Sequence, residues 1–193
     1  LLLRVAREVK DVAMFYGQEM NRTTYNLARM NMILHGVHYR DFDIKQEDTL
    51  ENPQHLDDLP FEAIVANPPF SDKAWSNGID PIHDEFGRFD GYDIPPKKNG
   101  DYAFLLHVIK SMKSTGKGAI ILPHGVLFRG NVEETIRRNI IKRGYIKGII
   151  GFPPNLFYGT SIPACVIILD KENAESRKGI FMIDASKGFV KDG

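Results

Sequence analysis

The sequence has little cysteine, no excess of charge of either sign and no long apolar run, and each absence excludes a class of protein. Cys165 is the single cysteine, so no disulfide can form within the chain, and we expect an intracellular, cytoplasmic protein. Lys plus Arg and Asp plus Glu number 25 each, which leaves no basic excess to grip a nucleic-acid backbone tightly. No apolar stretch approaches the roughly 18 residues of a membrane span, and we expect neither a span nor a signal peptide.

What is present suits one α/β domain. Hydrophobic residues make up 42% of the 193 residues and charged residues 26%, the balance of a soluble globular protein. Strand and helix patterns alternate up to about residue 150, which predicts a Rossmann-like, doubly wound, mostly parallel sheet. The strands are expected at residues 13–17, 42–44, 61–66 and 119–122, and the helices at residues 2–9, 23–36, 101–116 and 132–143.

The last strands follow one another without intervening helices. Residues 146–150 and 164–169 are joined by a short loop, which predicts an antiparallel hairpin on this sheet, and residues 179–183 form a final strand. The helix pattern at residues 2–9 begins with no capping residue. We therefore expect residues 1–193 to be a single domain that lacks its N-terminal part.

Residues 71–100 interrupt the pattern with Gly, Pro, Asp, Asn, Lys and scattered aromatic residues. A loop of this length inside a compact domain is usually functional or mobile. A solvated insertion without a role explains the composition equally well.

The tetrapeptide Asn67, Pro68, Pro69, Phe70 directly follows the apolar stretch 61–66, which we expect to be a buried strand. The exocyclic amine of a nucleobase is a poor nucleophile, so an enzyme that methylates it needs acceptors for both N–H groups. The Asn67 side-chain oxygen and the Pro68 carbonyl can accept them, and the two prolines fix the backbone φ angles. Phe70 offers a face for an extruded base. These four residues are the predicted catalytic site; a turn that simply ends the strand is the alternative.

Two acidic residues follow the preceding strands. Glu19 lies past the strand at 13–17, and Asp48 lies past the strand at 42–44. Ligands of doubly wound sheets bind at the carboxyl ends of the strands, so we expect Glu19, Asp48 and Asn67 to face one crevice. Glu19 can accept hydrogen bonds from a ribose diol, and Asp48 can accept one from an adenine amino group. A solvated surface Glu and a turn-capping Asp are the plainer readings.

Other reactive residue types do not suggest a second site. His35, His38 and His55 lack the spacing of metal ligands, and methyl transfer to an amine needs neither metal nor thiol, so we predict no metal. His107 falls in an apolar helix pattern, and Cys165 begins an apolar strand. We expect both to be packed side chains.

On these residues the chain resembles the amino-methyltransferases that modify DNA, and more narrowly the modification subunit of type I restriction-modification systems. The Asn-containing form of the motif favours adenine, since relatives acting on cytosine N4 more often begin it with Ser. The resemblance extends over nearly the whole chain. Its motifs are ANPPF at residues 66–70, DTL at 48–50, DYAF at 101–104, LPHGVLFRG at 122–130 and, above all, NLFYGTSIP at 155–163.

The resemblance implies a class I S-adenosylmethionine-dependent fold, S-adenosylmethionine as methyl donor and N6-methyladenine in DNA as product. It implies a target-base pocket of Asn67, Pro68 and Phe70, and a cofactor site that adds Glu19, Asp48 and Thr49 to Asn67. Its expected partners are DNA, a specificity subunit and a restriction subunit, which fits the neutral charge. We expect the loop at residues 71–100 to be poorly ordered without DNA, with its aromatic residues and Lys97 and Lys98 closing over the flipped base or the backbone. The family places a Gly-rich turn before the first helix, so we expect the first strand and this loop to be missing.

Two other functions share parts of this pattern. The same tetrapeptide serves methyltransferases of guanine in ribosomal RNA and of glutamine in proteins, which lack the signature at residues 155–163. A scaffold fragment without catalysis is the second alternative, and the missing Gly-rich turn favours it.

Overall fold

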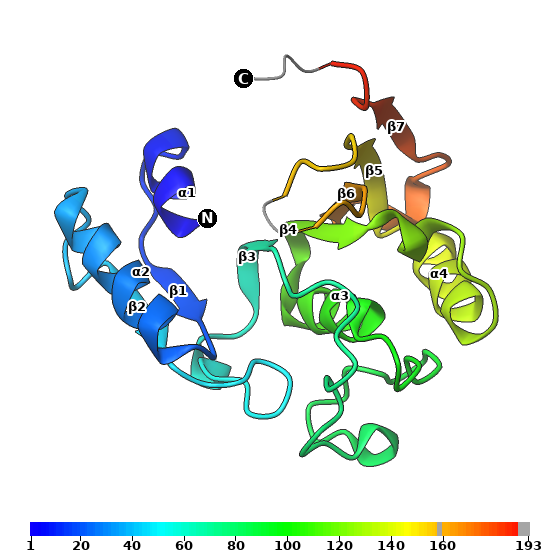
Figure 1. Ribbon diagram of the computed structural model, residues 1–193, viewed down its shortest axis with the longest axis horizontal. Helices are drawn as coiled ribbons and strands as arrows, with labels where there is room; N and C mark the ends of the chain where they lie inside the picture. The colour runs from blue at the N-terminus through cyan, green and yellow to red at the C-terminus, as the bar shows by residue number, and fades with distance from the viewer. Residues whose placement is uncertain (158–159, 189–193) are drawn as a thin grey trace. The chain divides into compact units, whose positions relative to one another are not determined.

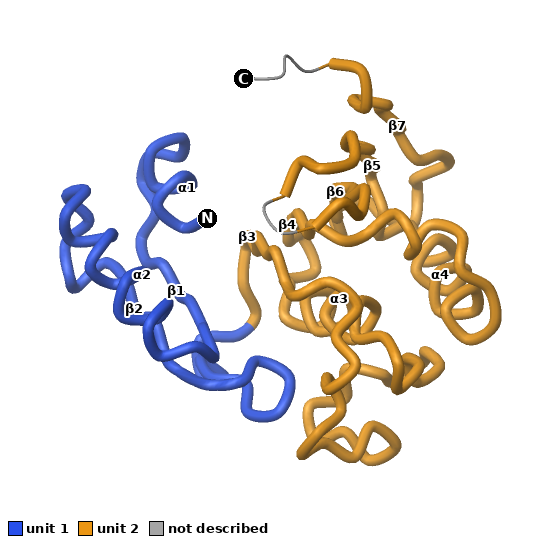
Figure 2. Tube along the Cα trace, viewed as in Figure 1, with its two compact units in different colours: residues 1–59 blue, residues 60–193 orange. Residues whose placement is uncertain are grey.

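The computed structural model describes residues 1–157 and 160–188. Tyr158 and Gly159, inside the predicted signature at 155–163, therefore lie outside the described residues. Figure 1 shows the helices and strands, and Figure 2 shows the two compact units into which the chain divides, residues 1–59 and 60–193. Within the described ranges, no helix is long and apolar enough to cross a membrane.

The first unit packs two helices against a pair of parallel strands. Its elements are α1 (Leu2–Glu8), β1 (Phe15–Gln18), α2 (Arg22–Leu34), β2 (Phe42–Lys45) and the 3-10 turn η1 (Leu56–Asp58). β1 pairs with β2 in parallel, from Phe15 opposite Phe42 to Gln18 opposite Lys45. Phe15, Met32, Phe42 and Ile44 are buried, and apolar side chains of both helices pack against them. Because the strands are parallel, the residues that follow them lie at the same edge of this sheet.

The second unit contains a five-stranded sheet with the order β3-β4-β6-β5-β7. Its strands are β3 (Phe61–Ala66), β4 (Met112–Pro123), β5 (Ile146–Gly151), β6 (Ala164–Asp170) and β7 (Phe181–Asp184). The α-helices are α3 (Asp101–Ser111) and α4 (Val132–Lys142), and the 3-10 turns are η2 (Pro81–His83), η3 (His124–Leu127) and η4 (Ala174–Ser176). β6 runs antiparallel to β4 and β5, whereas β3–β4 and β5–β7 are parallel pairs. The predicted α/β fold with an antiparallel hairpin is confirmed.

The core of this unit lies between the central strands and the two α-helices. β4 and β6 are the innermost apolar strands, and Ile120, Leu122, Ile167 and Leu169 are almost fully buried. Cys165 is also fully buried, and burial raises the pKa of its thiol to about 12, so the thiol is an unreactive core group.

Two local predictions were wrong. The helix expected at 101–116 ends at Ser111, and β4 begins at once. Phe61 pairs with Met112 but Ala63 pairs with Lys117, so residues 113–116 form a bulge opposite one residue of β3. A Cβ on Gly116 would lie 2.9–3.1 Å from backbone atoms, so this glycine serves the bulge and does not cap a helix.

The second wrong prediction concerns the burial of β3, which was expected to be a buried strand. Its side chains are half-buried or exposed, and Glu62 and Ala63 are exposed. Among the described residues β3 pairs only with β4, so it is an edge strand of the five-stranded sheet. An apolar run alone does not distinguish an edge strand from a central one.

Candidate active site

The four residues that follow β3 lie at the carboxyl edge of the second unit's sheet. Ala66 pairs with Ile120 of β4, and β4 ends nearby at Pro123, where η3 begins. Asn67 and Pro69 are exposed, and Pro68 and Phe70 are half-buried. The Asn67 side chain makes no hydrogen bond to any other described residue. The amide of Asn67 is therefore unengaged at the carboxyl end of β3.

A second aromatic ring lies beside Phe70. The rings of Phe70 and Phe157 meet edge to face, with centroids 5.7 Å apart and planes at 79°. Phe157 belongs to the segment that joins β5 to β6, so the hairpin loop reaches the motif at the end of β3. The motif at residues 155–163, which contains Phe157, was identified in the sequence, but the contact between Phe157 and Phe70 was not predicted. Two aromatic faces next to an exposed amide suit a planar base.

A buried acid fixes the backbone immediately after the motif. Ser71 has a positive φ of 54°, and its N–H donates to Asp101 Oδ1 at 2.8 Å. Asp101 is the first residue of α3, and its side chain is fully buried. Its Oδ2 accepts a hydrogen bond from Arg129 Nη2 at 2.6 Å. The start of α3 thus anchors the segment that carries the candidate catalytic residues.

Arg129 joins this acid to α4. Its Nε donates to Glu133 Oε2 at 2.5 Å, in the first turn of the helix. Burial opposes the charge on Arg129, but the hydrogen bonds to Glu133 and Asp101 hold its pKa above the usual value. The network was missed in the sequence, although the Arg129–Glu133 spacing of four residues at a helix start is a visible signal of an ion pair.

Two further donors hold η3 in place. Tyr102 donates its hydroxyl to the Val126 carbonyl at 2.6 Å, and burial raises the pKa of this phenol to about 12. Arg137 Nη1 donates to the same carbonyl at 3.1 Å and to the Arg129 carbonyl at 2.9 Å. Residues of the motifs at 101–104 and 122–130 thus contact each other and hold η3, which begins where β4 ends.

The first unit brings the two candidate cofactor acids to one edge of its own sheet. Glu19 follows β1 and is half-buried; its Oε1 accepts from Asn21 N at 2.8 Å. Asp48 follows β2, and its Oδ1 accepts from the N–H groups of Leu50 and Glu51 at 2.8 and 3.0 Å. Asp48 therefore caps this turn, and it does so with Oδ1 alone. The shared crevice with Asn67 joins two units and stays a prediction.

The remaining predicted residues have packing roles. His107 is half-buried on α3, where burial, reinforced by the charge of Arg88, lowers its pKa to about 4. It is therefore a neutral packed side chain, as expected. In the part of the chain that the structure describes, no three His, Cys, Asp or Glu side chains form a group that could hold a metal.

The segment 71–100 has a small core of its own. Arg88 and Asp84 form a buried ion pair at 2.5 Å, and Trp75 and Phe89 are buried with their rings edge to face at 5.9 Å. These aromatic rings are therefore engaged within the loop, while Lys97 and Lys98 are exposed. The expected mobility of the segment and its role over a base remain predictions.

The chain is similar to known proteins over nearly its whole length. The model of a family described as N-6 DNA Methylase matches residues 2–193. The chain is 37% identical, over its whole length, to the type I restriction enzyme MpnII methylase subunit of Mycoplasma pneumoniae, of which it covers 37%. It is 39% identical, over 92% of its length, to the HindI methylase subunit of Haemophilus influenzae, of which it covers 39%.

Two solved structures share the fold of this chain. The type I restriction-modification system methyltransferase subunit of Streptococcus thermophilus superposes with a TM-score of 0.83 and 40% identity, covering all of this chain and 41% of that one. A Listeria monocytogenes protein described as a class I S-adenosylmethionine-dependent methyltransferase, 17% identical with a TM-score of 0.65, shares the fold over 90% of this chain and 50% of that one. The chain thus spans about two fifths of the curated relatives it matches.

Proposed function

Because the chain belongs to the N-6 DNA methylase family, we propose that it forms the catalytic part of an enzyme that methylates the N6 amine of an adenine flipped out of DNA. The observation that carries this proposal is the exposed, unengaged amide of Asn67 at the end of β3, next to the paired rings of Phe70 and Phe157. The methyl donor we propose is S-adenosylmethionine, which supplies an activated methyl group on a sulfonium.

The residues of the motif would act on the target amine. The Asn67 side-chain oxygen and the Pro68 carbonyl accept its two N–H groups, which directs the nitrogen lone pair away from the ring and toward the methyl group. Phe70 and Phe157 hold the plane of the base. The amine loses one proton after it gains the methyl group. Since amide oxygens are not bases at neutral pH, this proton passes to water.

The proposed cofactor residues suit a nucleoside. Glu19 and Asp48 place two carboxylates at the carboxyl ends of parallel strands, where a ribose diol and an adenine amine can donate to them. Asp48 Oδ2 makes no hydrogen bond to another described residue, so it is available as an acceptor. Thr49 and Asn67 complete the proposed set. We therefore assign the donor's adenosine to this group of residues.

Replacing Glu19 by Gln should weaken S-adenosylmethionine binding about tenfold, because a hydrogen bond to a charged acceptor contributes about 1.5 kcal/mol. Titration calorimetry on the full-length protein that carries this chain measures the effect. Glu8→Gln is the matched control, since Glu8 is exposed at the end of α1. Equal affinities of the Glu19 variant and the parent would remove Glu19 from the cofactor site.

We further propose that residues 1–193 belong to one methyltransferase domain of a modification subunit that works in the cytoplasm with DNA, a specificity subunit and a restriction subunit. The names of the relatives support this assignment. The equal numbers of basic and acidic residues suit a subunit whose affinity for DNA comes mainly from a partner subunit. The loop at 71–100 would act at the DNA side of this domain.

The product identifies the function. The full-length protein with its specificity partner, given a labelled methyl donor and DNA, should yield N6-methyladenine in a nucleoside digest read by mass spectrometry. Methylguanine in RNA or methylglutamine in protein would instead support the related amino-methyltransferases. Absence of transfer, together with binding of the partner, would support a scaffold.

A further inference from the structure

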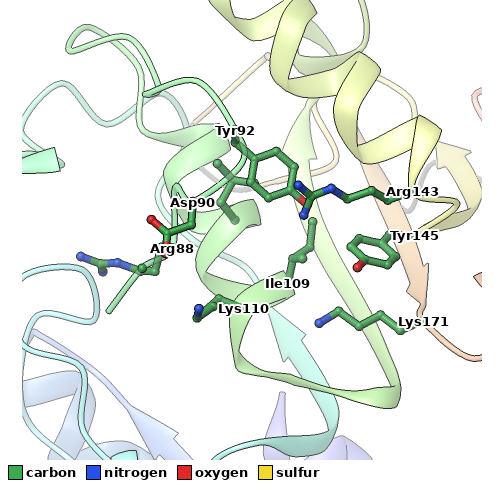
Figure 3. Close-up of a pocket in the computed structure, with 10 residues that line it drawn as sticks. Arg88, Asp90, Tyr92, Ile109, Lys110, Arg143, Tyr145 and Lys171 are labelled. Carbon is green, nitrogen blue, oxygen red and sulfur yellow. The ribbon is translucent and has the colours of Figure 1, made fainter. Parts of the chain in front are cut away.

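A small pocket lies in the second unit, at the end of the five-stranded sheet where β4 begins. The motif at residues 67–70 lies at the opposite end of the strands. Its volume is about 150 Å³, and its walls come from the end of the 71–100 loop, the last turn of α3 and the residues after α4 and β6 (Figure 3). Lys171 donates from its backbone to Gly116 and from its Nζ to Met112 at the beginning of β4. The motif instead follows Ala66, which pairs with Ile120 near the other end of β4.

The pocket gathers positive charge that the described residues do not neutralise. Lys110, Arg143 and Lys171 line it, and none of them forms an ion pair within residues 1–157 and 160–188. Asp90 is the carboxylate in the lining, and it too lies beyond ion-pair distance of these cations. By contrast, Lys147 on the same sheet has a carboxylate partner, Asp170 at 2.8 Å. The chain as a whole has no net charge, so the positive charge at this pocket is a local excess.

Two tyrosines hold the cations in place without cancelling their charge. The Arg143 guanidinium lies over the Tyr92 ring at 4.2 Å, and Lys171 Nζ lies over the Tyr145 ring at 5.4 Å. Figure 3 shows Arg143 and Lys171 directed into the pocket from one side, with Tyr145 between them and Lys110 across from Lys171. Burial lowers the pKa of Lys171, and the charges of Lys110 and Arg143 lower it further. The cations therefore repel one another in the free protein.

Hydrogen-bond donors remain available. Arg143 Nη2 donates to the Gly91 carbonyl at 3.1 Å, and Lys171 Nζ donates to the Met112 carbonyl at 3.2 Å. Each of these bonds uses one donor of a group that has three or five. The buried hydroxyl of Tyr92 makes no hydrogen bond to the described residues. Burial raises the pKa of this phenol, against the effect of Arg143, so it stays protonated as a donor.

We propose that this pocket binds the phosphoryl group of a phosphomonoester, either free phosphate or the terminal phosphate of a small metabolite. Arg88 also lines the pocket, but its charge is paired with that of Asp84. The other three cations against one carboxylate leave two positive charges, which match the near-dianionic charge of this group. Arg143, Lys110 and Lys171 would supply charge-assisted hydrogen bonds, and Tyr92 a neutral one. The volume is below the roughly 300 Å³ of sites that enclose larger ligands, so the phosphoryl group enters and the rest of the molecule stays outside.

Calorimetric titration of the full-length protein with inorganic phosphate, in a dilute chloride buffer without methyl donor or DNA, tests this site. Saturable binding at one site is expected. Lys110→Gln and Arg143→Gln should each weaken it about tenfold, since a hydrogen bond to a charged group contributes about 1.5 kcal/mol. Both side chains are exposed enough for these variants to fold. Lys142→Gln is the matched control, because Lys142 is exposed on the same helix end and does not line the pocket.

Competition distinguishes the source of the phosphate. Adenosine monophosphate should displace inorganic phosphate, whereas a phosphodiester dinucleotide and duplex DNA should not. Absence of saturable phosphate binding would overturn the proposal, and so would an equal loss in Lys142→Gln. Displacement by duplex DNA would assign the pocket to a nucleic-acid backbone instead. Methyl transfer is not measured, so the outcome is independent of the proposed activity.

Discussion

Replacing Asn67 by Ala should slow methyl transfer at saturating methyl donor by roughly two to three orders of magnitude, with little change in the affinity for DNA. The reason is that the side-chain oxygen of Asn67 would stabilise the amine only as it becomes nucleophilic. Removal of one preorganised hydrogen-bonding group of this kind costs about 2.7–4 kcal/mol of the barrier. Single-turnover transfer from labelled S-adenosylmethionine to DNA, by the full-length protein with its specificity partner, measures this loss.

Asn26→Ala provides the matched control. Asn26 is an exposed asparagine on α2, outside the proposed target-base and cofactor residues, and its side chain makes no hydrogen bond to the described residues. The rate of this variant should stay within a factor of about two of the parent, because surface substitutions usually act within about 0.5 kcal/mol. If Asn67→Ala also stays within a few-fold, the assignment of the target pocket is wrong.

Replacing Arg129 by Met should lower the free energy of unfolding of the second unit by about 3–5 kcal/mol. Met keeps much of the side-chain volume but leaves Asp101, which is fully buried, and Glu133, which is nearly so, without their cation. Breaking a buried pair from one side carries this cost because an uncompensated charge remains. Denaturant unfolding of the full-length protein, followed by a probe in this unit, measures the change.

Arg138→Met, on α4, is the control. Arg138 pairs with Glu134 at 2.7 Å, also four residues apart, but the two side chains are 69% and 42% exposed. Such exposed helix pairs contribute about 0.3–0.5 kcal/mol. Similar losses in the two variants would mean that the buried network contributes no more than a surface ion pair. The Arg129 variant should also slow methylation, because Asp101 fixes the N–H of Ser71 just after the motif.

The local parts of this protein could be predicted from its sequence. The bounds of β3 match the apolar stretch 61–66, and the hairpin of β5 and β6 follows from two apolar runs with a loop between them. The motif from Asn67 to Phe70 could be placed at the end of a strand because it directly follows the apolar stretch, and its chemical role stays a prediction. Each of these inferences uses only the order of residues along a short piece of chain.

The contacts that complete the site join distant segments and could not be read this way. Asp101 meets the Ser71 N–H across 30 residues, and Phe157 reaches Phe70 from the far hairpin. The role of Gly116 also depends on strand pairing. After a helix pattern a glycine suggests a C-cap, but here a Cβ would meet the backbone of Lys113 in the bulge and the Phe61 carbonyl of the neighbouring strand. A pattern gives the type of an element, whereas the neighbours of a residue depend on the whole fold.

The place of β6 between β4 and β5 bears on how the protein is made. Both neighbours precede β6 in the chain, so on the ribosome each has an apolar edge with no partner until residues 164–170 emerge. At roughly 5–20 residues per second this interval lasts on the order of one to a few seconds. During it the nascent chain presents open strand edges of the kind that aggregate. The unpaired edges of β4 and β5 are therefore accessible to chaperones for a limited period during synthesis. This period ends when β6 pairs with both strands.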